Sequence, residues 1–327
     1  MKVSILKTLK DQKGQYVSGE ALSNRLGVSR TAIWKHIAAL REEGHSIESS
    51  SRKGYKLLSS PDIILAEEIQ AELATGVFGR EMIYMDTVSS TNTVAKEKAA
   101  ENYPEGTVVI ANHQTAGKGR LGRKWESARG TGVWMSVILR PDITPAQAPL
   151  ITIFAALAVA RVLEQVTGVK PGVKWPNDIV YHKAKVCGIL TEMSAEIEQV
   201  NYVVVGIGIN VHHNIEDYPA AIRETATSLK AVTGQRFERK TIIKNVLEQF
   251  EEVYRSTQDA KKELIEEYKK YSLTLGSMVK VTSRDGMIEG EAVEITDEGE
   301  LMVRTKDGTM HTIFSGEVSV RGLYGYV

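Results

Sequence analysis

The sequence predicts a multidomain α+β protein, and three observations carry this prediction. Its 327 residues exceed the length of a typical single domain. Helical periodicity dominates residues 1–45, whereas strand and helix patterns mix over residues 83–271 and only short strands follow residue 275. We therefore expect three domains, with these bounds: residues 1–60, 65–272 and 273–327.

The composition is that of a soluble globular protein, with 42% hydrophobic and 25% charged residues. The net charge is +0, but it is unevenly distributed. Residues 1–60 hold eleven Lys and Arg against five Asp and Glu, so this segment carries +6 and the remainder −6. A basic N-terminal domain joined to an acidic body predicts a nucleic-acid partner for the first domain alone.

Cysteine usage and hydropathy predict a cytoplasmic protein without membrane association. Cys187 is the single cysteine, which excludes an intrachain disulfide and suits a reducing compartment. Residues 1–7 contain too few consecutive apolar side chains for a signal peptide. The longest apolar run, Leu150–Ala160, is shorter than the roughly 20 residues that span a bilayer, so we expect a buried helix there.

The first sixty residues fit a winged helix-turn-helix. Ser18 and Ser29 are placed to cap the second and third of three helices, and Gly27 permits a tight turn between them. Apolar positions recur at helical spacing: Val3, Ile5, Leu6, Leu9, Leu22, Leu26, Ile33, Ile37 and Leu40. Alternation from Ile47 to Leu57 around a basic turn predicts the hairpin that forms the wing.

The outer face of the third helix carries small and basic side chains that suit a DNA major groove. The basic turn of the hairpin suits phosphate contacts, which set affinity rather than sequence choice. These positions are the predicted DNA-binding residues: Ser29, Arg30, Thr31, Trp34, Lys35, Arg52 and Lys53. A three-helix packing domain with no DNA-binding role is the alternative.

The middle of the chain is organised around the loop Gln114–Trp125. Three glycines and four cations lie within its last nine residues. Glycines let a backbone approach a ligand closely, and the cations Lys118, Arg120, Arg123 and Lys124 can bind phosphate or carboxylate. Trp125 adds a flat face for stacking on a base. The loop is therefore predicted to close over an anion, with a solvated basic turn as the alternative.

Two further segments place polar side chains beside predicted strands. Ser89–Asn92 separates the strand Ile83–Val88 from a helix, and a helix N-terminus can hold a polar or anionic ligand. Plain helix capping is the alternative for these residues. Pro176 breaks a strand, so Asn177 and Asp178 should project from a constrained turn. Lys185 precedes the next strand, where an ordinary surface lysine is the alternative.

The other predicted elements complete the body and the C-terminal domain. Strands are expected at 107–112, 133–139, 186–190 and 202–210, with helices at 146–166 and, as a charged pair, within 240–271. Five short strands are expected at 278–282, 290–295, 301–304, 310–314 and 318–321. Such strands, separated by glycine or acidic turns, predict a small barrel.

Several familiar motifs are excluded. Gly117-Lys118-Gly119 lacks the spacing of a phosphate-binding P-loop, and Gly206-Ile-Gly208-Ile-Asn210 lacks the third glycine of a dinucleotide fingerprint. The apolar neighbours of Cys187 argue against a nucleophile. Adjacent His212 and His213 are more typical of a polar turn than of a metal site.

Six motifs in order give the chain a specific resemblance. They are Ser90-Thr91-Asn92, the Gly117–Trp125 run, Lys174-Trp175-Pro176-Asn177-Asp178, Lys185-x-x-Gly188-Ile-Leu, Gly206-Ile-Gly208-Ile-Asn210 and Phe314-Ser-Gly316-Glu. Over essentially its full length the chain resembles the bifunctional biotin protein ligases that also repress the biotin operon. The resemblance implies a central mixed-sheet α/β ligase domain and a C-terminal SH3-like β-barrel.

The resemblance also implies an activity. The biotin carboxylate attacks the α-phosphate of ATP with Mg²⁺, and the resulting biotinoyl-AMP acylates a lysine of a biotin carboxyl carrier domain. Biotinoyl-AMP would also act as corepressor by inducing a homodimer that binds operator DNA. A biotin-sensing repressor without enzymatic activity and a lipoate-type ligase are the alternatives.

Residue roles follow from the motif positions. The implied catalytic residues are Lys185, Arg120 and Asp178, and Asp178 is also the implied metal ligand. The implied biotin-binding residues are Ser90, Thr91, Asn92, Gln114, Lys118, Gly119, Arg120, Lys185, Gly188 and Gly206. The implied ATP-binding residues are Arg120, Arg123, Trp125, Asn177 and Asn210. The family commonly has arginine where this chain has Lys118, and lysine lacks the planar fork of a bidentate donor.

Overall fold

The computed structural model describes residues 1–327 except 13, 43, 60–61, 284–285, 315–318 and 323–327. The chain divides into two compact units, Met1–Ile63 and Ile64–Val327. The predicted boundary at Ser60-Pro61 and the Ser315–Glu317 part of the last motif lie outside the described residues.

The N-terminal unit is the predicted winged helix-turn-helix. Its elements are α1 (Lys2–Asp11), α2 (Gly19–Leu26), α3 (Arg30–Glu42), β1 (Ser46–Ser50) and β2 (Gly54–Ser59). The hydroxyls of Ser18 and Ser29 accept hydrogen bonds from the amides of Ala21 and Ala32, at 3.0 and 3.2 Å. Gly27 ends α2 with a φ of +66°, which glycine adopts without strain.

The predicted core of this unit is confirmed with one exception. The buried side chains are Ile5, Leu6, Leu9, Leu22, Ile33, Ile37, Leu40 and Ile47, with Leu26 packed against them. Val3, by contrast, is 49% exposed, because it lies on the outer side of α1. Trp34 is 59% exposed on α3, beside the exposed Thr31 and Lys35, so this face is open to a partner.

The second unit is built on a seven-stranded mixed sheet with the order β3-β4-β5-β9-β8-β7-β6. Its strands are β3 (Met82–Val88), β4 (Val108–Gln114), β5 (Gly132–Leu139), β6 (Gly172–Lys174), β7 (Asp178–Tyr181), β8 (Ala184–Ala195) and β9 (Val200–Asn210). Only the β3–β4 pair is parallel. The strand expected before Pro176 is the short β6, whereas β7 was not predicted and begins at Asp178, which was expected in the turn. Strands β8 and β9 extend beyond their predicted bounds.

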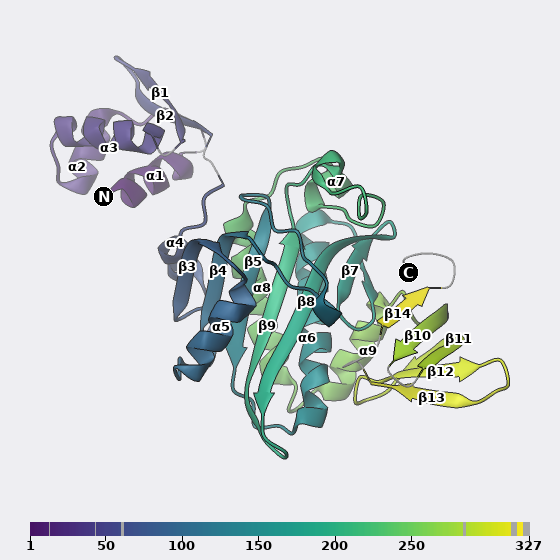
Figure 1. Cartoon of the computed structure of the whole chain (residues 1–327). Helices are drawn as coiled ribbons and strands as arrows, with labels where there is room; N and C mark the ends of the chain where they lie inside the picture. The colour runs from purple at the N-terminus through teal and green to yellow at the C-terminus, as the bar shows by residue number, and fades with distance from the viewer. Residues whose placement is uncertain (13, 43, 60–61, 284–285, 315–318, 323–327) are drawn as a thin grey trace. The chain divides into compact units, whose positions relative to one another are not determined.

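Helices cover both faces of the sheet (Figure 1). On one face α5 (Thr91–Ala100) packs over Val109, Ile138 and Val204. On the other lie α6 (Ala148–Thr167), α8 (Arg239–Ser256) and α9 (Lys261–Tyr271). Two shorter helices, α4 (Ala66–Glu72) and α7 (Leu229–Thr233), were not predicted.

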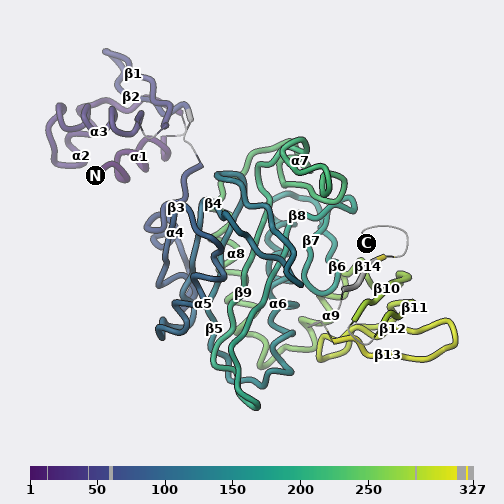
Figure 2. Tube along the Cα trace, viewed as in Figure 1, coloured from purple at the N-terminus to yellow at the C-terminus, as the bar shows by residue number. Residues whose placement is uncertain are grey.

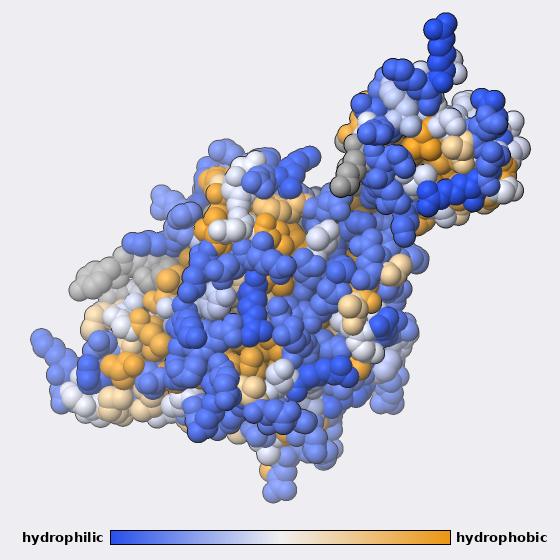
Figure 3. All heavy atoms as spheres, turned by 180° about the vertical axis from the view of Figure 1, so that it is seen from behind, coloured by the Kyte–Doolittle hydropathy of each residue, from blue (hydrophilic) through white to orange (hydrophobic). Residues whose placement is uncertain are grey.

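The apolar helix α6 is a core element, as predicted. Among the described residues, one segment, Pro145–Thr167, is long and apolar enough to cross a membrane, and 78% of its apolar 18-residue stretch is buried within the fold. Charged α8 and α9 pack against it. Figure 3 shows that the face seen from behind is mostly hydrophilic, with apolar patches between the blue side chains.

The C-terminal strands form a five-stranded antiparallel sheet in the order β13-β12-β11-β10-β14. They are β10 (Met278–Ser283), β11 (Gly286–Ile295), β12 (Leu301–Thr305), β13 (Met310–Ile313) and β14 (Ser319–Gly322). The chain trace brings this sheet beside α9 (Figure 2), where Lys269 pairs with Glu294 at 2.7 Å. The sheet belongs to the same compact unit as the body, so a domain boundary at residues 272 and 273 stays a prediction.

Glu251 on α8 generates a stability prediction, because its carboxylate accepts three backbone hydrogen bonds, from Gly76, Val77 and Phe78, at 2.7 to 2.9 Å. Burial raises the pKa of Glu251, but these three donors and Arg255 outweigh burial, and the pKa lies below its usual value. Replacing it by Gln should lower the free energy of unfolding by about 2 kcal/mol at neutral pH, since an amide cannot accept all three bonds.

Because the pKa of Glu251 is lowered in the folded protein, its contribution to the free energy of unfolding is present above the unfolded-state pKa. That contribution is lost as pH falls through the lower folded-state pKa. Urea unfolding of wild type and Glu251→Gln should therefore differ at neutral pH and converge in acid. Glu252→Gln on the same helix, where the side chain is 69% exposed, is the matched control. Equal stability of wild type and Glu251→Gln at neutral pH would contradict the prediction.

Candidate functional site

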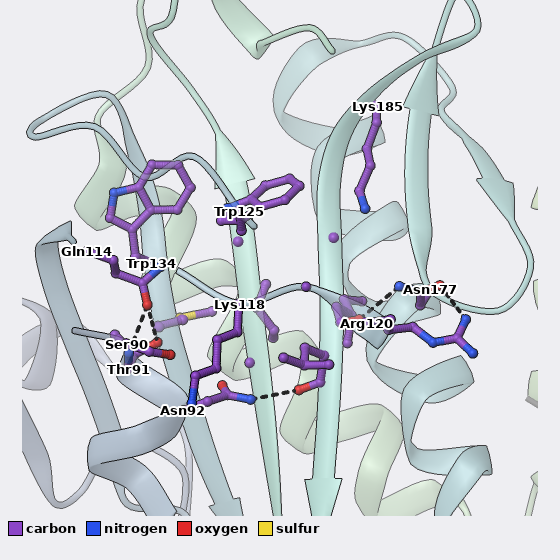
Figure 4. Close-up of a pocket in the computed structure, with 18 residues that line it drawn as sticks. Ser90, Thr91, Asn92, Gln114, Lys118, Arg120, Trp125, Trp134, Asn177 and Lys185 are labelled. Carbon is purple, nitrogen blue, oxygen red and sulfur yellow. Dashed lines mark hydrogen bonds between the residues drawn. The ribbon is translucent and has the colours of Figure 1, made fainter. Parts of the chain in front are cut away.

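A pocket with an empty volume of about 440 Å³ lies over strands β5, β8 and β9 (Figure 4). The loop Gln114–Ser127 and the start of α5 form its walls. Its lining residues are Ser90, Thr91, Asn92, Gln114, Lys118, Gly119, Arg120, Trp125, Trp134, Met135, Asn177, Lys185, Gly188, Ile189, Leu190, Gly206, Ile207 and Gly208.

Glycines on two paired strands form the floor of the pocket. Gly188 on β8 pairs in register with Gly208 on β9, and Gly206 faces the same side because side chains alternate along a strand. A Cβ at Gly206 would lie 2.1 Å from Asn92 Oδ1, and one at Gly208 would lie 2.6 Å from Trp125 Nε1. Any larger residue would therefore fill the space that these two side chains occupy.

The loop Gln114–Trp125 folds over this floor as an irregular hairpin. Backbone hydrogen bonds join Gly119 N to Arg123 O at 2.7 Å and Trp125 N to Gly117 O at 2.9 Å. Trp125 thereby lies against the glycine floor and meets Trp134 edge to face, with 6.4 Å between ring centroids. The loop thus contributes a wall of the pocket through Arg120 and Trp125, while the cations Lys118, Arg123 and Lys124 are exposed, as the alternative of a solvated basic turn expects.

Cations gather at one end of the pocket. Lys185 Nζ lies 2.6 Å from Asp178 Oδ1 and 4.9 Å from the centroid of the Trp125 ring. Arg120 Nη1 donates to Asn177 Oδ1 at 3.2 Å. Burial lowers the pKa of Arg120, an effect that Asp178 opposes and Arg123 reinforces. Because arginine stays ionised at neutral pH, this is a partly desolvated cation that an anionic ligand would stabilise.

The segment that carries Asn177 is held from the C-terminal side of the unit. Trp175 N donates to Thr274 Oγ1 at 2.9 Å, and its indole Nε1 donates to Gly299 O at 3.0 Å. Tyr268 OH donates to Pro176 O at 3.1 Å. These bonds, with Asn177 Nδ2 to Ile189 O at 2.9 Å, place the amide of Asn177 beside Arg120.

The opposite end of the pocket is rich in hydrogen-bonding groups and also holds Lys118, whose Nζ donates to Thr93 Oγ1 at 3.0 Å at the start of α5. Thr91 donates to Gln114 Oε1 through its backbone amide at 2.8 Å and through its hydroxyl at 3.2 Å. Gln114 Nε2 donates to Ser127 Oγ at 2.8 Å. Ser90 occupies the N-cap position of α5 but makes no side-chain capping bond. Plain side-chain capping by Ser90 is therefore wrong. Gln114 holds the first amide of the helix, that of Thr91, and the Ser90 hydroxyl lies at the pocket wall.

Three predicted site residues do not line this pocket. Arg123 is exposed on the loop, and Asp178 reaches the site through its contact with Lys185. Asn210 is 3% exposed, donates from Nδ2 to Thr227 O at 3.1 Å, and keeps Oδ1 buried without a hydrogen-bond partner. Conversely, the lining positions Trp134, Met135, Ile189, Leu190, Ile207 and Gly208 were missed. Alternation along the predicted strands could have placed Trp134, Leu190 and Gly208 on this face.

Two other sequence expectations are settled by burial. Cys187 is fully buried, as its apolar neighbours predict, and burial raises its thiol pKa, which disfavours the thiolate that a nucleophile needs. His213 is 2% exposed and stacks on Tyr218 with 4.9 Å between ring centroids, so a polar turn is wrong for this residue. Burial lowers the pKa of His213 to about 4. No cluster of three metal-ligating side chains occurs among the described residues.

Family models match three parts of the chain. The Biotin/lipoate A/B protein ligase family matches residues 84–210. An HTH domain matches residues 3–56, and the Biotin protein ligase C terminal domain matches residues 274–321.

Individual proteins match over longer stretches. The chain is 42% identical over 307 residues to the bifunctional ligase/repressor BirA of Bacillus subtilis and 41% identical to that of Bacillus spizizenii, with 94% of each chain covered in both cases. Its structure is similar to the biotin protein ligase from Aquifex aeolicus in complex with biotin and ATP, with a TM-score of 0.65 and 33% identity over 74% of this chain and 99% of that one. The chain therefore belongs to the bifunctional ligase/repressor BirA family.

Proposed function

We propose that this protein is an ATP-dependent biotin protein ligase that attaches biotin to a lysine of biotin carboxyl carrier domains, and that it represses transcription with biotinoyl-AMP as corepressor. The observation that carries the proposal is one pocket with a hydrogen-bonding end around Thr91 and Gln114 and an end where Arg120 and Lys185 gather. Biotin matches this division, because a neutral urea head and a carboxylate lie at opposite ends of the molecule. The single buried Cys187 suits a cytoplasmic location.

In the first step a biotin carboxylate oxygen bonds to the α-phosphorus of ATP, and diphosphate leaves. Negative charge then develops on the phosphate oxygens, and preorganised cations in a water-poor site stabilise it. Arg120 and Lys185 are the cations in position. Asn177 Oδ1 holds Arg120 at 3.2 Å, and Asp178 Oδ1 holds Lys185 at 2.6 Å. We assign Lys185 and Arg120 to charge stabilisation and Asp178 to positioning Lys185.

In the second step an acceptor lysine amine attacks the biotinoyl carbonyl and AMP leaves. The mixed anhydride must be kept from water until the acceptor arrives. The loop Gln114–Trp125 serves this role, because Trp125 lies on the glycine floor and Gly119 and Arg120 line the pocket.

The end of the pocket with Arg120 and Lys185 offers Mg²⁺ one carboxylate, that of Asp178, which already contacts Lys185. Mg²⁺ is usually held by one or two carboxylates together with substrate phosphates, where it neutralises phosphate charge. Asp178 is the carboxylate in place, and it already lies 2.6 Å from Lys185 Nζ. A bound ion would share this carboxylate with Lys185.

Two buried polar atoms support adenine recognition next to this site. Trp125 Nε1 and Asn210 Oδ1 are both buried without a hydrogen-bond partner. Trp125 Nε1 lies over Gly208, and Asn210 follows two residues along the same face of β9. An amide acceptor suits the amino group of adenine and would repel the carbonyl oxygen of guanine.

Homodimerisation is supported by an open strand edge. The pairing of β7 with β8 ends at Gly188, so within the described residues the β8 edge beyond Ile189 has no strand partner. A second hollow of about 530 Å³, lined in part by Arg120, Thr191 and Met193, runs along this edge. Because Arg120 borders both hollows, ligand binding can influence the edge. A symmetric dimer would supply two winged helices to a palindromic operator.

Transfer of labelled biotin tests the central proposal. Wild type with ATP, Mg²⁺, labelled biotin and a carrier domain should label the carrier, and Lys185→Ala should slow adenylate formation at least about 100-fold. Lys183→Ala, which changes an exposed lysine in the adjacent turn, should behave as wild type. Labelling with lipoate instead of biotin, or wild-type rates in Lys185→Ala, would refute the assignment.

Nucleotide choice tests the role of Asn210. Wild type should use ATP at least about 100-fold better than GTP, and Asn210→Ala should lose most of this preference because the buried acceptor is gone. Asn201→Ala, at the exposed start of β9, is the matched control. The ratio of kcat/KM values for the two nucleotides is the measurement, and an unchanged ratio in Asn210→Ala would remove the residue from the site.

Sedimentation tests the dimer. Biotin with ATP should shift wild type from monomer towards dimer, whereas Met193→Lys should remain monomeric, because a charge on an edge strand blocks edge pairing. Adenylate formation by Met193→Lys reports that the variant is folded. The same association state with and without biotinoyl-AMP would rule out this form of regulation.

A further inference from the structure

Glu192 makes charged contacts immediately behind the end of the pocket that Thr91 and Gln114 form. It lies on β8 on the same face as Gly188 and Leu190. One carboxylate oxygen accepts from Asn92 Nδ2 at 2.8 Å, and the other lies 2.5 Å from Lys96 Nζ. Glu192 belongs to none of the residue sets assigned above.

The amide of Asn92 is held in one orientation. Nδ2 also donates to Leu190 O at 3.1 Å (Figure 4), and Oδ1 accepts from Ser136 Oγ at 2.6 Å. Asn92 is 3% exposed and lies against Gly206. The two amide orientations have nearly the same shape, so hydrogen-bond partners decide between them. A carboxylate and a carbonyl both accept, and they therefore require Nδ2 on their side.

The orientation of Asn92 is passed on to the ligand-facing residues. Ser136 Oγ lies 2.6 Å from Asn92 Oδ1 and 2.8 Å from Thr91 Oγ1, and the Thr91 hydroxyl donates to Gln114 Oε1. The hydroxyl of Ser136 has one proton, so it can donate fully to Asn92 Oδ1 or to Thr91 Oγ1 but not to both. Reversing the Asn92 amide would point an N–H at Ser136 and force that proton towards Thr91.

We propose, resting on the proposed function, that Glu192 is a positioning residue whose negative charge sets the polarity of the hydrogen-bond chain that receives the urea head of biotin. Lys96 keeps this carboxylate ionised. A urea presents one carbonyl acceptor and two N–H donors, so it binds only when the donors and acceptors of the pocket have the matching order. Glu192 acts through Asn92, Ser136 and Thr91 without touching biotin.

The charge balance around Glu192 makes this role testable by pH. The charged groups facing it are Lys96 from α5 and Lys118 from the loop. Burial raises the pKa of Glu192, but the hydrogen bonds from Lys96 and Asn92 and the charges of both lysines outweigh burial, so the pKa lies below its usual value. Wild type therefore keeps the carboxylate ionised, and loss of Lys96 should raise its pKa.

Biotin and ATP affinities of the full chain, measured separately by calorimetry, provide the test. Glu192→Gln can present a donor to Asn92, so it should weaken biotin binding about tenfold and leave ATP binding within about twofold. Lys96→Met should lose biotin affinity at a higher pH than wild type as pH falls, because a carboxyl whose pKa has been raised loses its charge earlier. The double variant should show the Glu192→Gln affinity without this added pH dependence.

The control is Lys98→Met, which removes a lysine on the same helix that pairs with Glu101 at 2.6 Å instead of Glu192. Its affinity and pH profile should match those of wild type. Wild-type biotin affinity in Glu192→Gln, equal losses for biotin and ATP, or parallel pH profiles of Lys96→Met and wild type would overturn the proposal. Failure of wild type itself to bind biotin would instead overturn the proposed function.

Discussion

The site depends on the absence of side chains at three positions of the central sheet. Gly188, Gly206 and Gly208 bring bare backbone to the surface of β8 and β9, and Asn92 and Trp125 occupy the space above them. The close approach of Asn92 to Gly206 lets α5 reach the sheet, and that of Trp125 to Gly208 lets the loop close. One packing constraint therefore positions both ends of the pocket.

The two ends differ in how they handle charge. At the cationic end, Arg120 and Lys185 are partly withdrawn from water and are held by Asn177 and Asp178. At the other end the carboxylate of Glu192 accepts a hydrogen bond from Asn92, and Lys96 offsets its charge. The cations Arg120 and Lys185 favour an anionic tail at their end of the pocket, where an acyl-adenylate reaction would place the carboxylate.

Local sequence signals predicted much of this fold because the physics behind them is local. Ser18, Ser29 and Gly27 bound helices through contacts within a few residues. The short strand β7 was missed, because its four residues carry no usable periodicity and pair only when the body folds. His213 was misjudged for a related reason, since its partner Tyr218 stacks on it only after the following turn forms.

By itself the sequence determined the order of elements, the basic N-terminal domain and the motifs that mark the family, since these need only composition, spacing and short-range bonds. Only the tertiary structure decided which residues share a pocket. Glu192 lies 100 residues from Asn92 along the chain, and Thr274 lies 99 residues from Trp175. No local pattern encodes such contacts, because they exist only once strand register and helix packing bring the segments together.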